Sequence, residues 1–274
     1  MQNPAFRNAA FQPGAQGAVA TMTAAQLQEL YDQPSAQKPA SDPMTVQDTL
    51  AKSGLSFLVL LATAAIGWVM VALFVQNGQG GAAVGTFAVA AIVGLVLGLV
   101  NAFKREPSPA LILIYAAAQG VFIGGISQFM ETEFPGIVFQ AVLATLVVVG
   151  VTLALFVSGR IRASKRATKI FMIVLIAYAL FSLVNVVLMW TGAVQDPWGL
   201  RTSVTIAGIP LGIILGVLAV LLGAYSLVLD FDFVQQGVRN GAPRKYGWTA
   251  AFGIMVTVIW LYVEILRLIA IARR

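Results

Sequence analysis

Residues 137–157 read IVFQAVLATLVVVGVTLALFV and contain no charged side chain. An α-helix rises 1.5 Å per residue, so a run of about 20 apolar residues is long enough to cross the hydrocarbon core of a bilayer. The run is continuous and lacks the two-residue alternation that is typical of strands in a membrane β-barrel. It therefore predicts a membrane-spanning helix.

Six further runs share the length and the apolar character of this one. They lie near residues 55–76, 82–103, 109–129, 170–191, 206–230 and 248–272, with short connections between them. We therefore predict an all-α integral membrane protein, with a bundle of seven transmembrane helices over residues 51–274. The connection 76–81 is short, uncharged and rich in glycine, so a re-entrant hairpin made by the first two runs is the alternative there.

The composition excludes several kinds of chemistry. Of the 274 residues, 59% are hydrophobic and 10% are charged, whereas a soluble domain carries about 25% charged residues. Cysteine and histidine are absent, which excludes disulfides, cysteine zinc sites, thiol nucleophiles and histidine proton chemistry. We expect no metal site and no enzymatic activity, because a nucleophile with a neighbouring base is missing. The net charge of +6 resides in loops between apolar runs, so no nucleic-acid partner is expected.

The first 50 residues differ from the rest of the chain. They are rich in alanine, glutamine, proline and serine and show no sustained apolar period. Such a segment buries too little apolar surface to fold, so residues 1–50 are expected to form a polar, largely disordered tail. The pattern from Thr45 to Asp48 is that of a helix start just before the membrane.

The basic residues gather in alternate connections, which predicts the orientation. The opposite connections carry Glu131, Glu133, Asp196 and a single loop arginine, Arg201. Cytoplasmic loops carry an excess of Lys and Arg. We therefore expect a multi-pass plasma (inner) membrane protein with its N-terminus in the cytoplasm and its C-terminus outside. The basic residues on the expected cytoplasmic side are Lys52, Lys104, Arg105, Arg160, Arg162, Lys165, Arg166, Lys169, Arg239, Arg244 and Lys245.

Three charged residues fall inside the last two apolar runs. A charge deep in a bilayer is costly, so Asp230, Glu264 and Arg267 are expected to face a cavity or a partner. Glu264 and Arg267 are three residues apart and can instead pair with each other as structural contacts. Asp230 can instead be a solvated helix end. Asp232 lies about 200° further around a helix, so it cannot share a face with Asp230 and is expected at the cytoplasmic rim.

Uncharged polar residues also occur inside the runs. Gln119, Gln128 and Asn185 are expected to form hydrogen bonds between helices, and lining a pore is the alternative use.

Several local strings resemble one known family. The strings DFDFVQQG at 230–237, GAPRKYGW at 241–248 and IWLYVEILRLI at 259–269 are similar to the Bax inhibitor-1 family, in particular to a bacterial branch with a long N-terminal tail. SPALILIY at 108–115 and FPGIVFQA at 134–141 fit the same branch. The resemblance covers about residues 50–274. It implies seven helices, with the last helix central and wrapped by the other six.

The resemblance also implies a function. Family members conduct a pH-dependent calcium leak, and the proposed gate is a pair of carboxylates, one in the sixth helix and one in the seventh, that share protons. Partners would be the lipid bilayer and calcium or other cations, with no cofactor beyond transient Ca²⁺. Bacterial relatives also suggest an alternative, a regulatory scaffold that binds and modulates a membrane protease or another membrane complex.

The resemblance assigns the gate position in the sixth helix to one residue of this chain, but it leaves two alternatives for the seventh helix. Asp230 takes the place of the carboxylate in the sixth helix. In the seventh helix one register places Glu264 at the gate, whereas the other places Thr257 there and makes Arg267 the arginine near the helix end. Counted from the loop residues Arg239 and Lys245, Asp230 lies about 13 Å deep, Thr257 about 18 Å and Glu264 about 28 Å, so depth favours Thr257.

The third helix departs from the family pattern as well. Gln119 stands where family members often carry a glutamate, so one negative charge is missing from the expected cation path.

Overall fold

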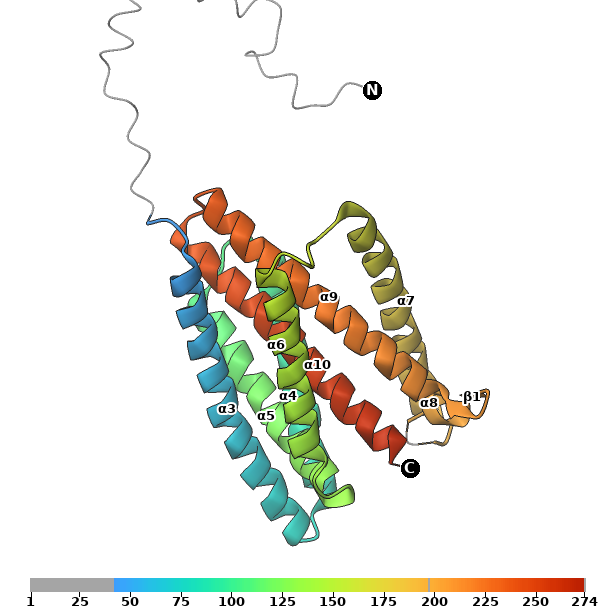
Figure 1. Cartoon of the computed structure of the whole chain (residues 1–274). Coiled ribbons are helices and arrows are strands. Elements are labelled where there is room, and N and C mark those ends of the chain that lie inside the picture. The colour runs from blue at the N-terminus through green and yellow to red at the C-terminus, as the bar shows by residue number, and fades with distance from the viewer. Residues whose placement is uncertain (1–41, 197, 274) are drawn as a thin grey trace, which may run out of the picture. The chain divides into compact units, whose positions relative to one another are not determined.

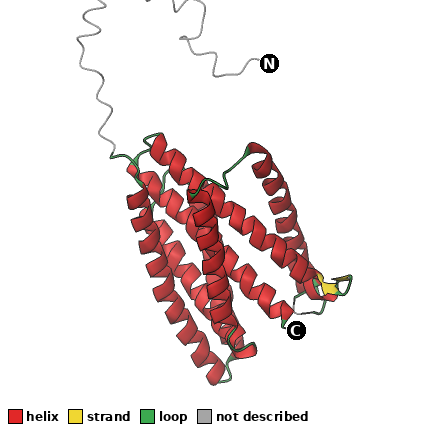
Figure 2. Ribbon diagram, viewed as in Figure 1, coloured by secondary structure: helices red, strands yellow, loops and turns green. Residues whose placement is uncertain are grey.

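The computed structural model describes residues 42–196 and 198–273 (Figure 1). Within this described part, seven helices are long and apolar enough to cross a membrane, which confirms the predicted seven-helix protein. They are α3 (Val46–Gln76), α4 (Gly80–Phe103), α5 (Pro109–Glu133), α6 (Ile137–Val157), α7 (Lys165–Trp190), α9 (Leu211–Arg239) and α10 (Gly247–Ala272). Figure 2 shows that helices dominate the membrane domain.

The first helix begins where the capping pattern indicates. Thr45 is the N-cap of α3, and its side-chain oxygen accepts a 3.1 Å hydrogen bond from the backbone N–H of Asp48. Residues 46–50, which the sequence placed with the tail, thus form the first turn of α3. Residues 42–45 of the predicted tail lead into α3, and residues 1–41 lie outside the described residues.

The α7–α9 connection holds structure that the sequence did not predict. It contains the short helix α8 (Leu200–Ser203) and an antiparallel hairpin of β1 (Thr205–Ile206) and β2 (Ile209–Pro210). The two turn residues, Ala207 and Gly208, both have positive φ, as the favoured two-residue hairpin turns require. The helix predicted from residue 206 therefore begins only at Leu211, after Pro210.

The same helix runs further than predicted at its other end. α9 continues through Asp230 to Arg239 because apolar residues such as Val234, which is buried, continue its packing face. Asp230 thus lies inside the helix, and the alternative of a solvated helix end is wrong.

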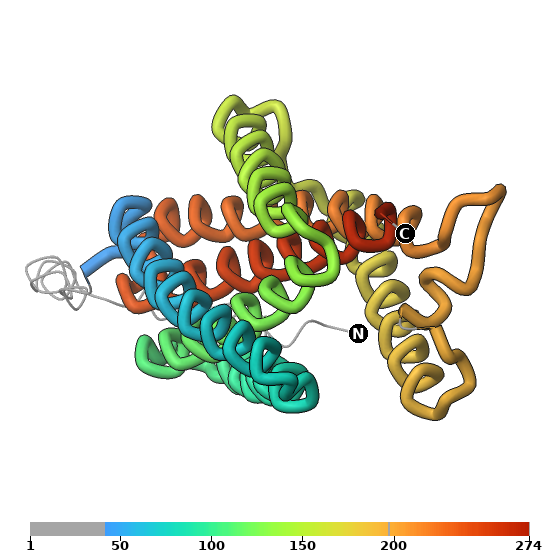
Figure 3. Tube along the Cα trace, turned by 90° about the horizontal axis from the view of Figure 1, so that it is seen from below, coloured from blue at the N-terminus to red at the C-terminus, as the bar shows by residue number. Residues whose placement is uncertain are grey.

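The last helix is the central one. α10 is the most buried of the seven helices, and it contacts α3, α5, α6 and α9 directly. Tyr178 of α7 also reaches it through the ring of Trp260. α4 packs chiefly on α5, further from the centre. Figure 3 shows α10 and α9 side by side, with α6 on one side of the pair. In the same view α3 and α5 lie near the N-terminal half of α10.

The basic residues lie together as predicted. The start of α3 and the connections 104–108, 158–164 and 240–246 lie at one end of the bundle, here called the basic end (Figure 1). The connections 77–79, 134–136 and 191–210 lie at the opposite end, here called the far end, as does the end of α10.

The N-terminal segment is fastened to the loop between α9 and α10. Pro43 forms a β-bridge with Pro243, and the N–H of Met44 donates a 2.7 Å hydrogen bond to the carbonyl of Ala242. The Met44 side chain is only 1% exposed. Asp48 accepts a 2.9 Å hydrogen bond from Nε of Arg244 in the same loop. We call this set of contacts between residues 43–52 and 240–246 the clasp.

Candidate functional site

Two helix faces meet at the candidate site. Ser226 and Asp230 lie one turn apart on α9, and Gly253 and Thr257 lie one turn apart on α10. Residues four apart share one face of a helix, so these pairs can face each other across the seam between α9 and α10.

Asp230 is held by Thr257. The Thr257 hydroxyl donates a 2.7 Å hydrogen bond to Oδ2 of Asp230. The other carboxylate oxygen, Oδ1, lies against Gly253, where an added Cβ would stand only 3.0 Å from it. Glycine at position 253 therefore lets the carboxylate approach the backbone of α10.

Ser226 completes the arrangement, and sequence reasoning missed it. Its Oγ lies 3.2 Å from Oγ1 of Thr257, one helical turn further from the basic end than Asp230. The sequence does contain one indication of its role: Ser226 lies four residues before Asp230 and therefore on the same face of the helix.

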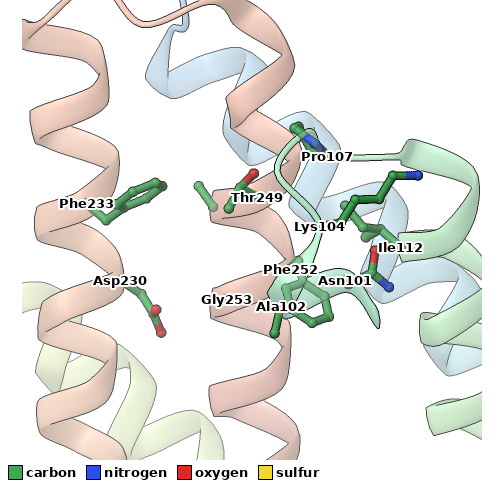
Figure 4. A pocket seen from close by; sticks show the side chains of 11 residues that line it. Asn101, Ala102, Lys104, Pro107, Ile112, Asp230, Phe233, Thr249, Phe252 and Gly253 are labelled. Atoms are coloured by element: carbon green, nitrogen blue, oxygen red, sulfur yellow. The ribbon is translucent and has the colours of Figure 1, made fainter. Parts of the chain in front are cut away.

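A pocket leads to Asp230 from the basic end. Its volume is about 260 Å³, and residues of α4, α5, α9, α10 and the α4–α5 connection line it. Figure 4 shows Asp230 and Phe233 directed from α9 toward α10, whereas the Lys104 side chain, also part of the lining, points away from Asp230. Asn101 and Thr249 add neutral polar side chains. The carboxylate is thus reachable from the basic end.

Beyond Asp230 the seam between α9 and α10 is closely packed. Leu227 and Leu261 are fully buried there. A Cβ added at Gly223 would stand 2.5 Å from Leu261. The two helices are therefore in close contact around Gly223 and Leu261.

Glu264 and Arg267 lie elsewhere. Glu264 is seven residues beyond Thr257, or about 10 Å along α10, and it forms an ion pair with Arg267, as their spacing predicts. Nε1 of Trp260 donates a 3.2 Å hydrogen bond to Oε1 of Glu264, and Nη2 of Arg267 donates one of 3.0 Å to the Tyr178 hydroxyl. Of the two possible neighbours for Asp230, the structure therefore brings Thr257 to it.

Arg201 joins the Glu264 group and was missed by the sequence. The sequence placed it in a loop, and the structure shows that its side chain is only 2% exposed. Its Nη2 donates hydrogen bonds of 3.1 Å to Tyr178 and 2.9 Å to Ser182. The connection carrying it folds back toward α7, where the N–H of Leu200 donates a 2.7 Å hydrogen bond to Asn185. Tyr178 thus links two arginines.

The remaining polar residues lie outside the pocket. Asp232 accepts a 2.6 Å hydrogen bond from Gln236, one turn on along the same helix. Gln119 lies against Gly94 of α4, close enough that a Cβ there would be 2.6 Å from its side-chain nitrogen. Gln128 donates to Thr132 within α5, so the hydrogen bond to another helix expected for Gln128 is not formed.

A metal site of the usual acidic kind is not evident. Within residues 42–196 and 198–273, no group of three or more Asp, Glu, His or Cys side chains is arranged to hold a metal ion. Ca²⁺ prefers six to eight oxygen ligands, and the pocket offers the single carboxylate of Asp230.

Comparison with known proteins identifies the family. No curated protein sequence matches the chain. A family model described as Bax inhibitor 1 like matches residues 3–274. This match spans nearly the whole sequence, including both helices of the candidate site, and the chain therefore belongs to the Bax inhibitor-1-like family.

Proposed function

We propose that the protein is a pH-sensitive passive leak for calcium or other cations, gated by protonation around Asp230. The observation that carries the proposal is the hydrogen bond between Thr257 and Asp230 at the inner end of a pocket that opens toward the basic end. The family membership supports it, because the carboxylate in the sixth helix is the part of the family gate that this chain retains.

The ionised carboxylate favours the closed arrangement. A hydrogen bond to an ionised acceptor is roughly twice as strong as one between neutral groups. The bond from Thr257 therefore holds α9 and α10 together most firmly when Asp230 carries its charge. The packed seam around Leu227 and Leu261 is then the closed state of the leak.

Protonation weakens this connection. A neutral carboxyl group loses the charge-assisted part of the bond, and α9 and α10 can separate more readily. The two helices then act as a two-state element that local electrostatics switches. We therefore expect the leak to increase as the pH falls through the titration range of Asp230.

The gate differs from a pair of carboxylates in its attraction for ions. One carboxylate binds a divalent ion more weakly than two, and Gln119 contributes no charge. Ca²⁺ would accordingly pass as a transient occupant. Lys104 at the pocket wall would moderate the approach of any cation.

The test is calcium flux into dye-loaded liposomes over a range of pH. The wild-type flux should rise as the pH falls, whereas D230N should leak at all pH values because its neutral side chain mimics the protonated acid. D232N is the matched control, since Asp232 bonds within its own helix, and its flux should follow wild type. Wild-type flux equal to that of empty liposomes at every pH would reject the proposal.

The second candidate is a scaffold that binds a membrane protease or another membrane complex. This candidate is supported by the connection 158–164 and the first five residues of α7, which carry five exposed basic side chains and no acidic one. They are Arg160, Arg162, Lys165, Arg166 and Lys169. Crosslinking in native membranes should then enrich one partner, and deletion of residues 1–45 should reduce that enrichment. Unchanged partners and phenotype after the deletion would remove this candidate.

A further inference from the structure

A chain of hydroxyl groups ends at Asp230. Ser226 Oγ lies 3.2 Å from Thr257 Oγ1, and the Thr257 hydroxyl donates to Asp230 Oδ2 at 2.7 Å. The three groups thus run from α9 to α10 and back to α9.

Counting protons decides the direction of each hydrogen bond. An ionised carboxylate can only accept, so Thr257 must give its single proton to Asp230. The Thr257 oxygen can then only accept from Ser226, which makes Ser226 the donor. A protonated Asp230 can itself donate to Thr257, and the Thr257 hydroxyl can then turn to Ser226. The direction of the chain therefore reverses with the proton on Asp230.

Ser226 belongs to the few helical hydroxyls that pair with a side chain of another helix, as Ser127 does with Tyr262. Ser53 and Ser56 of α3 donate to backbone carbonyls one turn earlier in their own helix, at 2.9 Å in each case. Serine within a membrane helix commonly bonds in this way. Ser226 instead pairs with a side chain of the neighbouring helix.

Among the residues that the structure describes, no other ionisable group takes part in this chain of hydroxyls. Asp232 points to another face of α9, Lys104 points away from Asp230, and α6 has no ionisable residue. Tyr115 of α5 packs on Phe252, beside the pocket. Other charged groups on neighbouring elements have partners of their own: Glu264 pairs with Arg267, Glu106 with Lys245, and Asp48 with Lys52 and Arg244. Arg239 donates a hydrogen bond to Gln235 on its own helix, and Glu131 accepts hydrogen bonds from backbone N–H groups at the far end.

We propose that Ser226 is a positioning residue for the gate. By donating to Thr257 it directs the Thr257 proton to Asp230 and so stabilises the ionised, closed form. Hydrogen bonds in a chain polarise and strengthen one another, by about 10–30% per bond. The effect on flux rests on the proposed function, whereas the effect on the titration of Asp230 does not.

Infrared difference spectroscopy tests the proposal directly. The carbonyl band of a protonated carboxyl group is followed against pH in the purified full chain, and D230N identifies the band that belongs to Asp230. In S226A the midpoint should move to higher pH, by about half a pH unit. S226T, which keeps a hydroxyl, should restore the wild-type midpoint. The control S53A removes a hydroxyl that bonds its own helix, and it should leave the midpoint unchanged.

An S226A midpoint equal to that of wild type, or moved to lower pH, would overturn the proposal. A shift that S226T does not correct would also overturn it, because the effect would then come from packing and not from the hydroxyl. The band reports the proton on Asp230 whether or not ions flow. A protein with the expected shift and no flux would therefore reject the proposed leak and retain the role of Ser226.

Discussion

Thr257 donates a 2.7 Å hydrogen bond to Asp230 across the seam between α9 and α10. In one of the two registers that the family resemblance allows, Thr257 stands where the family has its second gate carboxylate. A hydroxyl cannot share a proton with a carboxylate as a second acid would. The titration of this site should accordingly belong to one acid, with a single step in place of the two steps of a coupled pair.

Gly253 should resist substitution because of its contact with Asp230. In G253A the new Cβ would stand 3.0 Å from Oδ1 of the carboxylate. Crowding of a packed site costs about 1–3 kcal/mol, so the free energy of unfolding should fall by that amount in a detergent titration. Gly150 of α6 has no atom within 4 Å of an added Cβ and is the matched control. Equal losses in G253A and G150A would contradict the close approach.

The clasp should contribute measurably to stability through Met44. Removing a buried methionine side chain costs about 2–5 kcal/mol, so M44A should lower the free energy of unfolding within that range. Hydrogen exchange in the loop 240–246 should also become faster, since the loop packs on this side chain. Met172 of α7 is exposed, and M172A should change neither quantity. Unaltered exchange in M44A would show that the loop is held by other contacts.

Glu264 should be needed to balance the two arginines around Tyr178. E264Q removes the carboxylate that pairs with Arg267 in the described part of the chain, and it leaves the partly buried Arg267 cation beside the buried Arg201 without that charge. Breaking a buried ion pair costs about 3 kcal/mol, and the partial exposure of Arg267 reduces this cost. The unfolding temperature of E264Q should therefore drop measurably below that of wild type.

The exposed pair of Glu106 and Lys245 provides the contrast. The hydrogen bond from Lys245 lowers the pKa of Glu106, yet water screens the pair. E106Q should unfold at the wild-type temperature, and an equal drop in both variants would contradict the distinction.

The orientation can be tested with single cysteines because the chain has none of its own. Ser158 is exposed at the basic end and Ala193 at the far end. A thiol reagent that cannot cross membranes should label Ala193→Cys in intact cells, and Ser158→Cys only after permeabilisation. The reverse labelling pattern would place the basic end outside.

The number and the lengths of the helices could be predicted from the sequence because the bilayer constrains the length of each membrane-spanning segment. Bilayer thickness sets the length of each apolar run, which is why seven helices could be predicted with α6 at its observed bounds. The register of Thr257 against Asp230 could be predicted because depth is counted along each helix at a constant rise.

Two features are harder to predict from one sequence. They are the face that each helix turns toward its neighbours and the way in which a connection folds back onto a helix. In a membrane both the lipid-facing and the protein-facing sides of a helix are apolar, so hydrophobic periodicity does not reveal which face Ser226 shares with a neighbour. Arg201 was misplaced for another reason. Its burial depends on a connection that folds back onto Asn185 of α7, and no local pattern around residue 201 encodes that contact.

The clasp has a mechanical consequence. Pro43 and Met44 are bonded to the turn that joins the helix of Asp230 to the helix of Thr257. A pull on the residues preceding Pro43 would therefore act on that turn through these contacts, and on α3 through the continuous backbone. In the leak that we propose, this turn joins the two helices whose separation would open the pathway, so a force at Pro43 would be felt at the gate.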